Sequence, residues 1–253
     1  MKGHGTRLGI LMILILLVCI TAIVILGTDT FSIKKITVSG SNAADTNVII
    51  NTSNISYGDN IFKINRALVK QRIENSPPYP IVLSILLKLP DEVEIKVQER
   101  TPAAIVPYLS SNILIDKTGF IIDIRKQQEE AGSPSVEGVI IQSFTKGYKL
   151  KLIESESFKL RVLLNLLESI YKLEVNDILT TINIEDPDNI KLYTRDGIEV
   201  FIGQAVDLDK KLGWLRSDAY SELLRQGLKG TLDVSAPGKA VFRPEEQLSE
   251  VGD

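Results

Sequence analysis

The sequence predicts an α+β protein that one N-terminal helix anchors in a membrane, with two domains outside it. Three observations support this. Residues 8–28 form an apolar run without a charged side chain. The next 70 or so residues show the order strand, helix, helix, strand, strand. After Arg100 the pattern becomes strand-rich and contains two amphipathic helical stretches, which predicts a second, mixed domain.

The predicted anchor is the run Leu8–Thr28, which Ile, Leu and Val dominate. As a helix it spans about 32 Å, enough for a hydrocarbon layer of ~30 Å. A cleaved signal peptide is the alternative, but its apolar core is usually shorter and precedes an A-x-A-like site. Thr21-Ala22-Ile23 does not fit such a site. We therefore expect a membrane helix that is retained.

The charges around this run predict its orientation. Lys2 and Arg7 precede it and Asp29 follows it, which favours a cytoplasmic tail over residues 1–7, although Lys34 and Lys35 on the far side weaken the bias. Everything after residue 28 is then extracytoplasmic. We expect a single-pass protein of the bacterial cell membrane, because an exported domain with so few cysteines is unusual among small eukaryotic secreted modules.

In the first domain, Ile33, Ile36 and Val38 indicate a strand that a turn at Gly40 ends. A short helix with an Asp cap is predicted over Asp45–Asn51. Asn65 is expected to cap a second helix, with Ala67, Leu68 and Ile73 on its apolar side and Val69 as a further candidate. Two strands follow, at Ile81–Leu86 and Glu92–Glu99.

The second domain begins with a hairpin predicted over Ile113–Ile122, whose turn is at Lys117–Gly119. Its remaining predicted elements are helix Ser157–Lys172, a hairpin of Ile190–Thr194 and Ile198–Ile202 around Asp196-Gly197, one helix from Leu208 to Leu223, strands Thr231–Val234 and Lys239–Arg243, and a disordered tail over 245–253.

Composition excludes several kinds of chemistry. With 29 basic and 32 acidic residues, the net charge of −3 leaves no basic footprint for nucleic acid. A single cysteine, Cys19, allows neither an intrachain disulfide nor a thiolate metal cage. The single histidine, His4, lies in the N-terminal tail, so His-dependent catalysis and His-rich metal sites are excluded. We predict no catalytic residue, metal or cofactor, and no small-molecule substrate.

Four stretches together resemble the FtsQ/DivIB family of bacterial cell-division proteins, in the family's order and behind one anchor. They are Phe31–Gly40, Leu89–Ala104, Leu114–Gly119 with Pro134–Gly138, and Leu232–Pro244. The resemblance implies a POTRA domain over 31–100 and a β domain over 101–244. It also implies a non-enzymatic scaffold that joins single-span coiled-coil proteins at the division septum and supports septal peptidoglycan synthesis.

Two other functions were weighed. A membrane-anchored cell-wall enzyme would use an S-x-x-K motif, which occurs at Ser32–Lys35, Ser143–Lys146 and Ser169–Lys172, with K-T-G at Lys117–Gly119. Three matches in one chain show that the pattern often arises by chance. The K-T-G also precedes two of them, whereas the acyl-serine enzymes place it last. A POTRA-type chaperone for exported polypeptides usually continues into a β-barrel, and no repeated amphipathic strands follow here.

The predicted partner site is the terminal strand, made of Lys239, Ala240, Val241, Phe242 and Arg243. An edge strand can accept a strand from another chain, but it can also simply close the sheet. The resemblance favours partner binding, and a proline at Val241 is expected to prevent it. At the domain junction, Glu99 and Arg100 form either an exposed ion pair or a charged hinge.

Overall fold

The computed structural model describes residues 3–26, 29–41, 43–126 and 132–245. The chain divides into two compact units, Met1–Arg100 and Thr101–Asp253. Parts of three predicted segments lie outside the described residues: the start of the cytoplasmic tail, the end of the anchor at 27–28, and the tail over 246–253.

Unit 1 begins with helix α1, Gly3–Leu26. In the part of the chain that the structure describes, no helix meets the combined length and apolarity that a membrane crossing requires.

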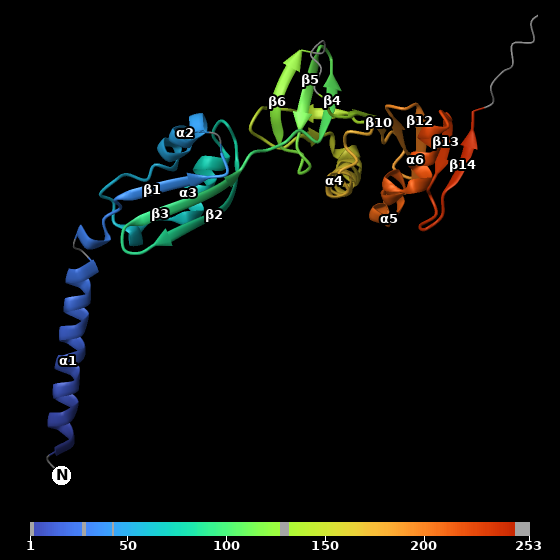
Figure 1. Cartoon of the computed structure of the whole chain (residues 1–253). Helices are drawn as coiled ribbons and strands as arrows, with labels where there is room; N and C mark the ends of the chain where they lie inside the picture. Colours follow the sequence, from blue (N-terminus) through green and yellow to red (C-terminus); the bar gives the residue numbers. More distant parts are fainter. Residues whose placement is uncertain (1–2, 27–28, 42, 127–131, 246–253) are drawn as a thin grey trace, which may run out of the picture. The chain divides into compact units, whose positions relative to one another are not determined.

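The rest of unit 1 is a three-stranded sheet with two helices, in the predicted order strand, helix, helix, strand, strand (Figure 1). Its elements are β1 Lys35–Ser39, α2 Ala43–Ser53, α3 Arg66–Glu74, β2 Ile81–Lys88 and β3 Glu92–Gln98. The central strand β3 pairs with β1 in parallel and with β2 antiparallel, so β1 and β2 are the edges. Ile33, Ile49, Ile73, Val93 and Ile95 form the centre of its core.

The helices of unit 1 confirm one prediction and correct two. Asn65 caps α3, because its side chain accepts the N–H of Leu68 over 3.1 Å. However, Leu68 is 40% exposed, and only Val69 and Ile73 of α3 are buried. Helix α2 starts at Ala43, which places Asp45 in the first turn instead of at the cap.

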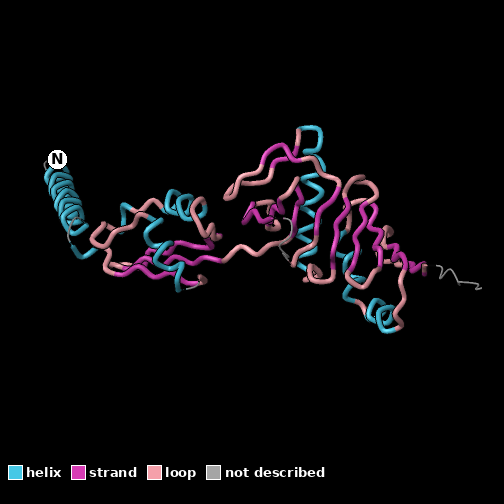
Figure 2. The backbone as a smooth tube through the Cα atoms, turned by 90° about the horizontal axis from the view of Figure 1, so that it is seen from above, coloured by secondary structure: helices cyan, strands magenta, loops and turns pink. Residues whose placement is uncertain are grey.

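Unit 2 contains a nine-stranded sheet in the order β14-β13-β12-β11-β10-β7-β4-β5-β6, whose strands lie side by side in Figure 2. The strands are β4 Ala104–Tyr108, β5 Ser111–Ile115, β6 Ile121–Lys126, β7 Ser135–Glu137, β10 Leu179–Asn183, β11 Ile190–Thr194, β12 Ile198–Gly203, β13 Gly230–Asp233 and β14 Val241–Pro244. Two short strands, β8 Ile141–Ser143 and β9 Lys151–Leu152, pair separately. Both predicted hairpins, β5–β6 and β11–β12, are confirmed.

Helices pack on one face of this sheet. They are α4 Ser157–Lys172, α5 Leu208–Leu212 and α6 Asp218–Arg225. The alternation of buried and half-buried residues along β11 shows that one sheet face is covered and the other is open. The single helix predicted from Leu208 to Leu223 is wrong, because a 3₁₀ turn over Gly213–Arg216 ends α5 and Ser217 caps α6 with its side chain.

Candidate functional site

The candidate site is the outer edge of β14, at the end of the nine-stranded sheet. β14 pairs antiparallel with β13 through Gly230–Pro244, Thr231–Arg243, Leu232–Phe242 and Asp233–Val241. Among the described residues no strand pairs with its outer side. The predicted boundaries need correction: Lys239 and Ala240 precede the strand, and Pro244 belongs to it. The N–H of Lys239 donates to the carbonyl of Ala236 over 3.2 Å, which closes a β-turn around Pro237-Gly238, where the sequence predicted it.

The backbone of β14 has a defined inner and outer side. The N–H of Glu245 donates to the carbonyl of Lys229 over 2.9 Å, so this pair is a hydrogen-bonded one. Hydrogen-bonded and non-hydrogen-bonded pairs alternate along an antiparallel ladder, so Arg243 and Val241 also bond inward to β13. Phe242 and Pro244 therefore face outward. Since proline has no N–H, Phe242 supplies the outward donor within the strand.

The side chains of β14 are divided between the two faces of the sheet. Phe242 is half-buried and packs against the core of unit 2. Val241 is 53% exposed on the open face. Arg243 on the same face forms an ion pair with Asp233 over 3.2 Å. On the open face, β14 therefore presents the apolar side chain of Val241, and Asp233 balances the charge of the nearby Arg243.

The turn before β14 is fixed by Asp233. Its Oδ1 accepts the hydroxyl of Ser235 over 2.7 Å and the N–H of Ser235 over 3.1 Å. These hydrogen bonds, together with Arg243, hold the pKa of Asp233 below its ordinary value. One carboxylate thus holds both the start of the turn and the strand that follows it.

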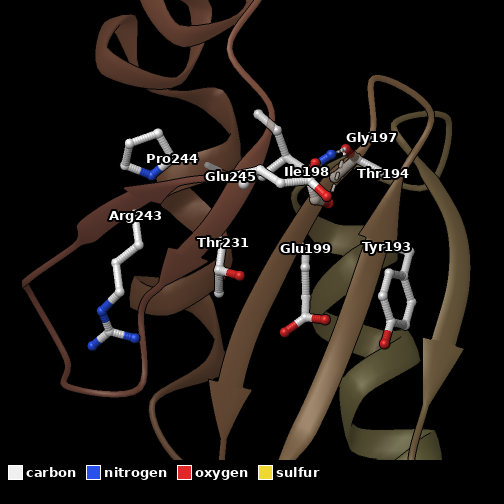
Figure 3. A pocket seen from close by; sticks show the side chains of 10 residues that line it. Tyr193, Thr194, Gly197, Ile198, Glu199, Thr231, Arg243, Pro244 and Glu245 are labelled. Atoms are coloured by element: carbon white, nitrogen blue, oxygen red, sulfur yellow. Dashed lines mark hydrogen bonds between the residues drawn. The ribbon is translucent and has the colours of Figure 1, made fainter. Parts of the chain in front are cut away.

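A pocket of about 500 Å³ opens on the exposed sheet face beside β14. Figure 3 shows Tyr193, Glu199, Thr231 and Arg243 in a row across four strands, as the strand registers require. Glu199 pairs with Lys191 over 3.3 Å. Burial, followed by the charge of Glu199, raises the pKa of the Tyr193 hydroxyl. A chain that binds along β14 would lie beside this polar row on the open face of the sheet.

The opposite edge of the sheet, β6, is covered by backbone hydrogen bonds at its first residue, Ile121. The N–H of Ile121 donates to the carbonyl of Tyr148 over 2.8 Å, and Gly147 donates back to Ile121 over 3.0 Å. Asp123 holds Lys146 over 2.8 Å on the same strand, which places charge at this edge. Of the two edges of the large sheet, β14 is thus the better template for a further strand.

Residues 31–100 match the family model of the FtsQ-type POTRA domain. The cell division protein DivIB of Clostridium acetobutylicum is 30% identical over 228 residues, which cover 89% of this chain and 88% of that relative. This chain belongs to the FtsQ/DivIB family of cell division proteins.

Further relatives agree with this assignment to the FtsQ/DivIB family. DivIB of Clostridium tetani is 28% identical over 90% of this chain and 84% of the relative, and FtsQ of Syntrophotalea carbinolica is 26% identical over 89% and 78%. A solved structure, the major extracytoplasmic domain of DivIB from Geobacillus stearothermophilus, covers 52% of this chain and 99% of its own, with 16% identity and a TM-score of 0.30. The two relatives and DivIB of Clostridium acetobutylicum are cell division proteins, which gives this FtsQ/DivIB chain a role in cell division.

The S-x-x-K motif at Ser169 does not form an activated nucleophile in this family member. Ser169 is 8% exposed in α4. Lys172 forms an ion pair with Asp209, which raises the pKa of Lys172, and the Ser169 hydroxyl helps to lower the pKa of Asp209. An ion pair that favours the charged form of Lys172 opposes the role of this lysine as a base for Ser169. Within the described residues no group of three or more His, Cys, Asp or Glu side chains is placed to hold a metal ion.

The junction residues lie just beyond β3, which ends at Gln98. Arg100 donates through Nε to the carbonyl of Tyr79 over 2.9 Å, which ties the end of unit 1 to the segment before β2. Glu99 is exposed. Sequence reasoning named Glu99, Arg100 and the strand around Val241 as candidates, and their roles stay predictions; it did not name the row beside β14. The alternation of Tyr193 and Glu199 with buried neighbours was the available signal.

Proposed function

We propose that this chain is a non-enzymatic, single-pass membrane scaffold of the division septum, and that it binds other single-span division proteins by pairing a strand with β14. The observation that carries the proposal is the open edge at Phe242, next to an exposed Val241. Main-chain hydrogen bonds give such an interaction its affinity, and alternate side chains give it specificity. Membership of the FtsQ/DivIB family of cell division proteins supports a location at the division septum.

The membrane anchor in this proposal is the run Leu8–Thr28, within and just beyond α1. The large apolar side chains from Ile10 to Ile20 are between 53% and 66% exposed, so the rest of the chain, as far as the structure describes it, leaves most of their surface uncovered. The hydroxyl of Thr21 donates to the carbonyl of Leu17 over 2.8 Å, which satisfies this polar group inside the helix. A lipid environment would cover such a helix on all sides.

The domain arrangement proposed for the scaffold places residues 1–7 in the cytoplasm and the POTRA domain over 31–100 and the β domain over 101–244 outside. The division of the chain after Arg100 supports this arrangement. The basic residues Lys2 and Arg7 support the orientation. Each domain then faces the same compartment as the exported domains of other single-span division proteins.

The deciding experiment compares Phe242→Pro with Phe242→Ala in the tagged full-length chain, purified from dividing cells. Both variants lose the same aromatic contact with the core. Only the proline removes the outward N–H, and because Phe242 lies in a non-hydrogen-bonded pair, no bond to β13 is lost. We expect Phe242→Pro to lose the co-purified single-span proteins while Phe242→Ala keeps most of them, as measured by mass spectrometry.

Val241→Pro is a less specific variant than the sequence suggested, because the N–H of Val241 faces β13. It would detach β14 from the sheet and confuse loss of folding with loss of binding. Thermal unfolding of each variant separates the two effects. If Phe242→Pro kept the wild-type transition and captured the same proteins, edge pairing at β14 would be wrong.

A further inference from the structure

Unit 1 also has an open sheet edge, along β2. In the described part of this unit no strand pairs with the outer side of β2. From Ile81 to Leu87 the strand has no charged residue, and Leu83 and Leu86 are 60% and 41% exposed. Natural edge strands usually carry charge or proline that prevents further pairing. Most of this strand lacks that protection.

The protection that exists is confined to the N-terminal end of β2. A bulge lies between Val82 and Ser84. The N–H of Val82 donates to the carboxylate of Glu74 on α3 over 3.0 Å. Both features are ways of closing an edge, and both end before Ser84. The regular and open part of β2 is therefore the segment Ser84–Lys88.

The hydrogen bonds of β3 show which groups of this segment point outward. The carbonyl of Asp91 accepts the N–H groups of Lys34 and Lys35, over 2.9 and 3.2 Å, on the side of β1. Backbone groups alternate sides along a strand, so Glu92 and Glu94 of β3 bond to β2. Their partners in the register are Lys88 and Leu86. The backbone groups of Ile85 and Leu87, the residues that alternate with these two along β2, thus face outward. Their N–H and C=O groups are open to a further strand.

We propose that the segment Ser84–Lys88 pairs with the same segment of a second copy of this chain, antiparallel and in a register centred on Leu86. Leu86 is the midpoint of the segment, so a two-fold axis there pairs the whole segment with itself. Ile85 of each copy then exchanges two main-chain hydrogen bonds with Leu87 of the other. The two sheets join into a sheet of six strands.

The side chains fit this register. On the open face Leu86 meets Leu86 of the second copy, which covers an exposed leucine on each side. Lys88 meets the small Ser84, and its charge is balanced within its own chain by Glu94 over 2.9 Å. On the core face Ile85 meets Leu87, and both belong to or pack against the core of unit 1. A shift by one residue would place core-facing side chains opposite open-face ones.

The contact is small, because each copy contributes one short strand. It needs a high local concentration, which two chains anchored in the same membrane have. This surface is separate from β14, so a dimer through β2 leaves the proposed partner edge open. The dimer rests on the proposed membrane anchor for its local concentration but not on partner binding at β14, so failure of strand pairing at β14 does not entail failure of the dimer.

The first test is disulfide cross-linking of the full-length chain in membranes of the expressing cell. Cys19 is replaced by serine, because it is exposed on α1. Leu86→Cys places two thiols at a non-hydrogen-bonded antiparallel pair, where Cα atoms are about 4.5 Å apart and a disulfide can form. Leu68→Cys is the matched control, since Leu68 is a leucine of the same unit with 40% exposure.

We expect roughly tenfold more disulfide-linked dimer with Leu86→Cys than with Leu68→Cys under mild oxidation. A mixture of Ser84→Cys and Lys88→Cys chains should cross-link better than either chain alone, because these two positions face each other. Equal dimer yields from Leu86→Cys and Leu68→Cys would overturn the proposal. Cross-linking of Ser84→Cys alone as strong as that of the mixture would overturn the register.

The second test is a charge swap that does not depend on a new covalent bond. Leu86→Glu and Leu86→Lys each place like charges directly opposite each other at the two-fold axis, and should weaken self-association roughly tenfold. Differently tagged copies of the two variants, expressed together, should regain association through an opposite-charge pair. Leu68→Glu is the control and should associate as the wild type does. Absence of recovery in the mixed sample, with both variants folded, would contradict the proposal.

Discussion

Arg243 on β14 and Asp233 on β13 form an ion pair over 3.2 Å, although the register places Arg243 opposite Thr231. The guanidinium reaches diagonally along β13 to the carboxylate that also holds Ser235. The pair therefore joins β14 to the turn that precedes it. Its charge dependence can be measured.

Asp233→Asn should lower the free energy of unfolding by about 1 kcal/mol at pH 6, because the amide keeps an acceptor for Ser235 but loses the ionic contact. The pKa of Asp233 is lowered in the folded protein, so its contribution is present above the unfolded pKa of about 3.9 and is lost as the pH falls through the folded value. Urea unfolding at pH 6 and pH 3 should show the difference between wild type and variant shrinking in acid. A pH-independent difference would contradict this assignment.

Ser169→Ala should leave septum formation unchanged, because the lysine of its motif is paired with Asp209, which favours the charged form of that lysine. Loss of the hydrogen bond to Asp209 should cost about 1 kcal/mol or less of stability. Complementation of a depleted strain, with protein abundance measured beside it, gives the answer. A division defect at normal abundance would restore the enzyme hypothesis.

Gly138→Ala should destabilise unit 2 by about 3 kcal/mol or more. A Cβ at Gly138, where φ is +83°, would lie 2.2 Å from the backbone nitrogen of Glu185, so backbone would have to move. Gly227→Ala is the matched control, because φ is +65° there but no atom lies within 4 Å of the added Cβ. It should cost only about 1 kcal/mol, the strain of the left-handed conformation. Similar losses in the two variants, measured by urea unfolding, would argue against the close approach.

Removal of residues 1–28 should release the protein from the membrane fraction, because the apolar side chains of α1 are the proposed anchor. In the intact chain, protease added outside the membrane should degrade the two domains that the proposal places there, and leave a small membrane-bound fragment. Recovery of a soluble form that begins near residue 30 would indicate cleavage of a signal peptide instead. Fractionation and N-terminal sequencing distinguish these outcomes.

Local signals predicted the hairpins well, because the turn residues themselves determine them. At the β5–β6 turn, Oδ1 of Asp116 accepts the N–H groups of Thr118 and Phe120 over 2.8 and 2.9 Å. At the β11–β12 turn, Thr194 and Ile198 exchange side-chain and backbone hydrogen bonds. These hydrogen bonds join residues at most four positions apart, so the local sequence is enough to predict the two turns.

Features that depend on distant residues were not predictable in the same way. The parallel insertion of β7 between β4 and β10 depends on which strands share the core, and hydrophobic periodicity does not encode that. The break between α5 and α6 was missed because Leu212 and Leu215 continue the apolar stripe through a 3₁₀ turn. For the candidate site, the residues Val241–Arg243 were predicted, but the outward direction of Phe242 follows from the pairing of Glu245 with Lys229.

The contrast between the β6 edge, with its hydrogen bonds at Ile121 and its charge at Asp123, and the open β14 edge has a consequence for the proposed assembly. In the proposed complex, the nine-stranded sheet accepts one further strand, at β14. That added strand then becomes the new edge of the sheet. The outward N–H and C=O groups of β14 would then be paired, and the added strand would expose such groups on its own outer side. If partners bind as proposed, further pairing would stop where the added strand carries its own proline, charge or bulge, so the sequence of the partner, and not that of this chain, would determine how many proteins join the sheet.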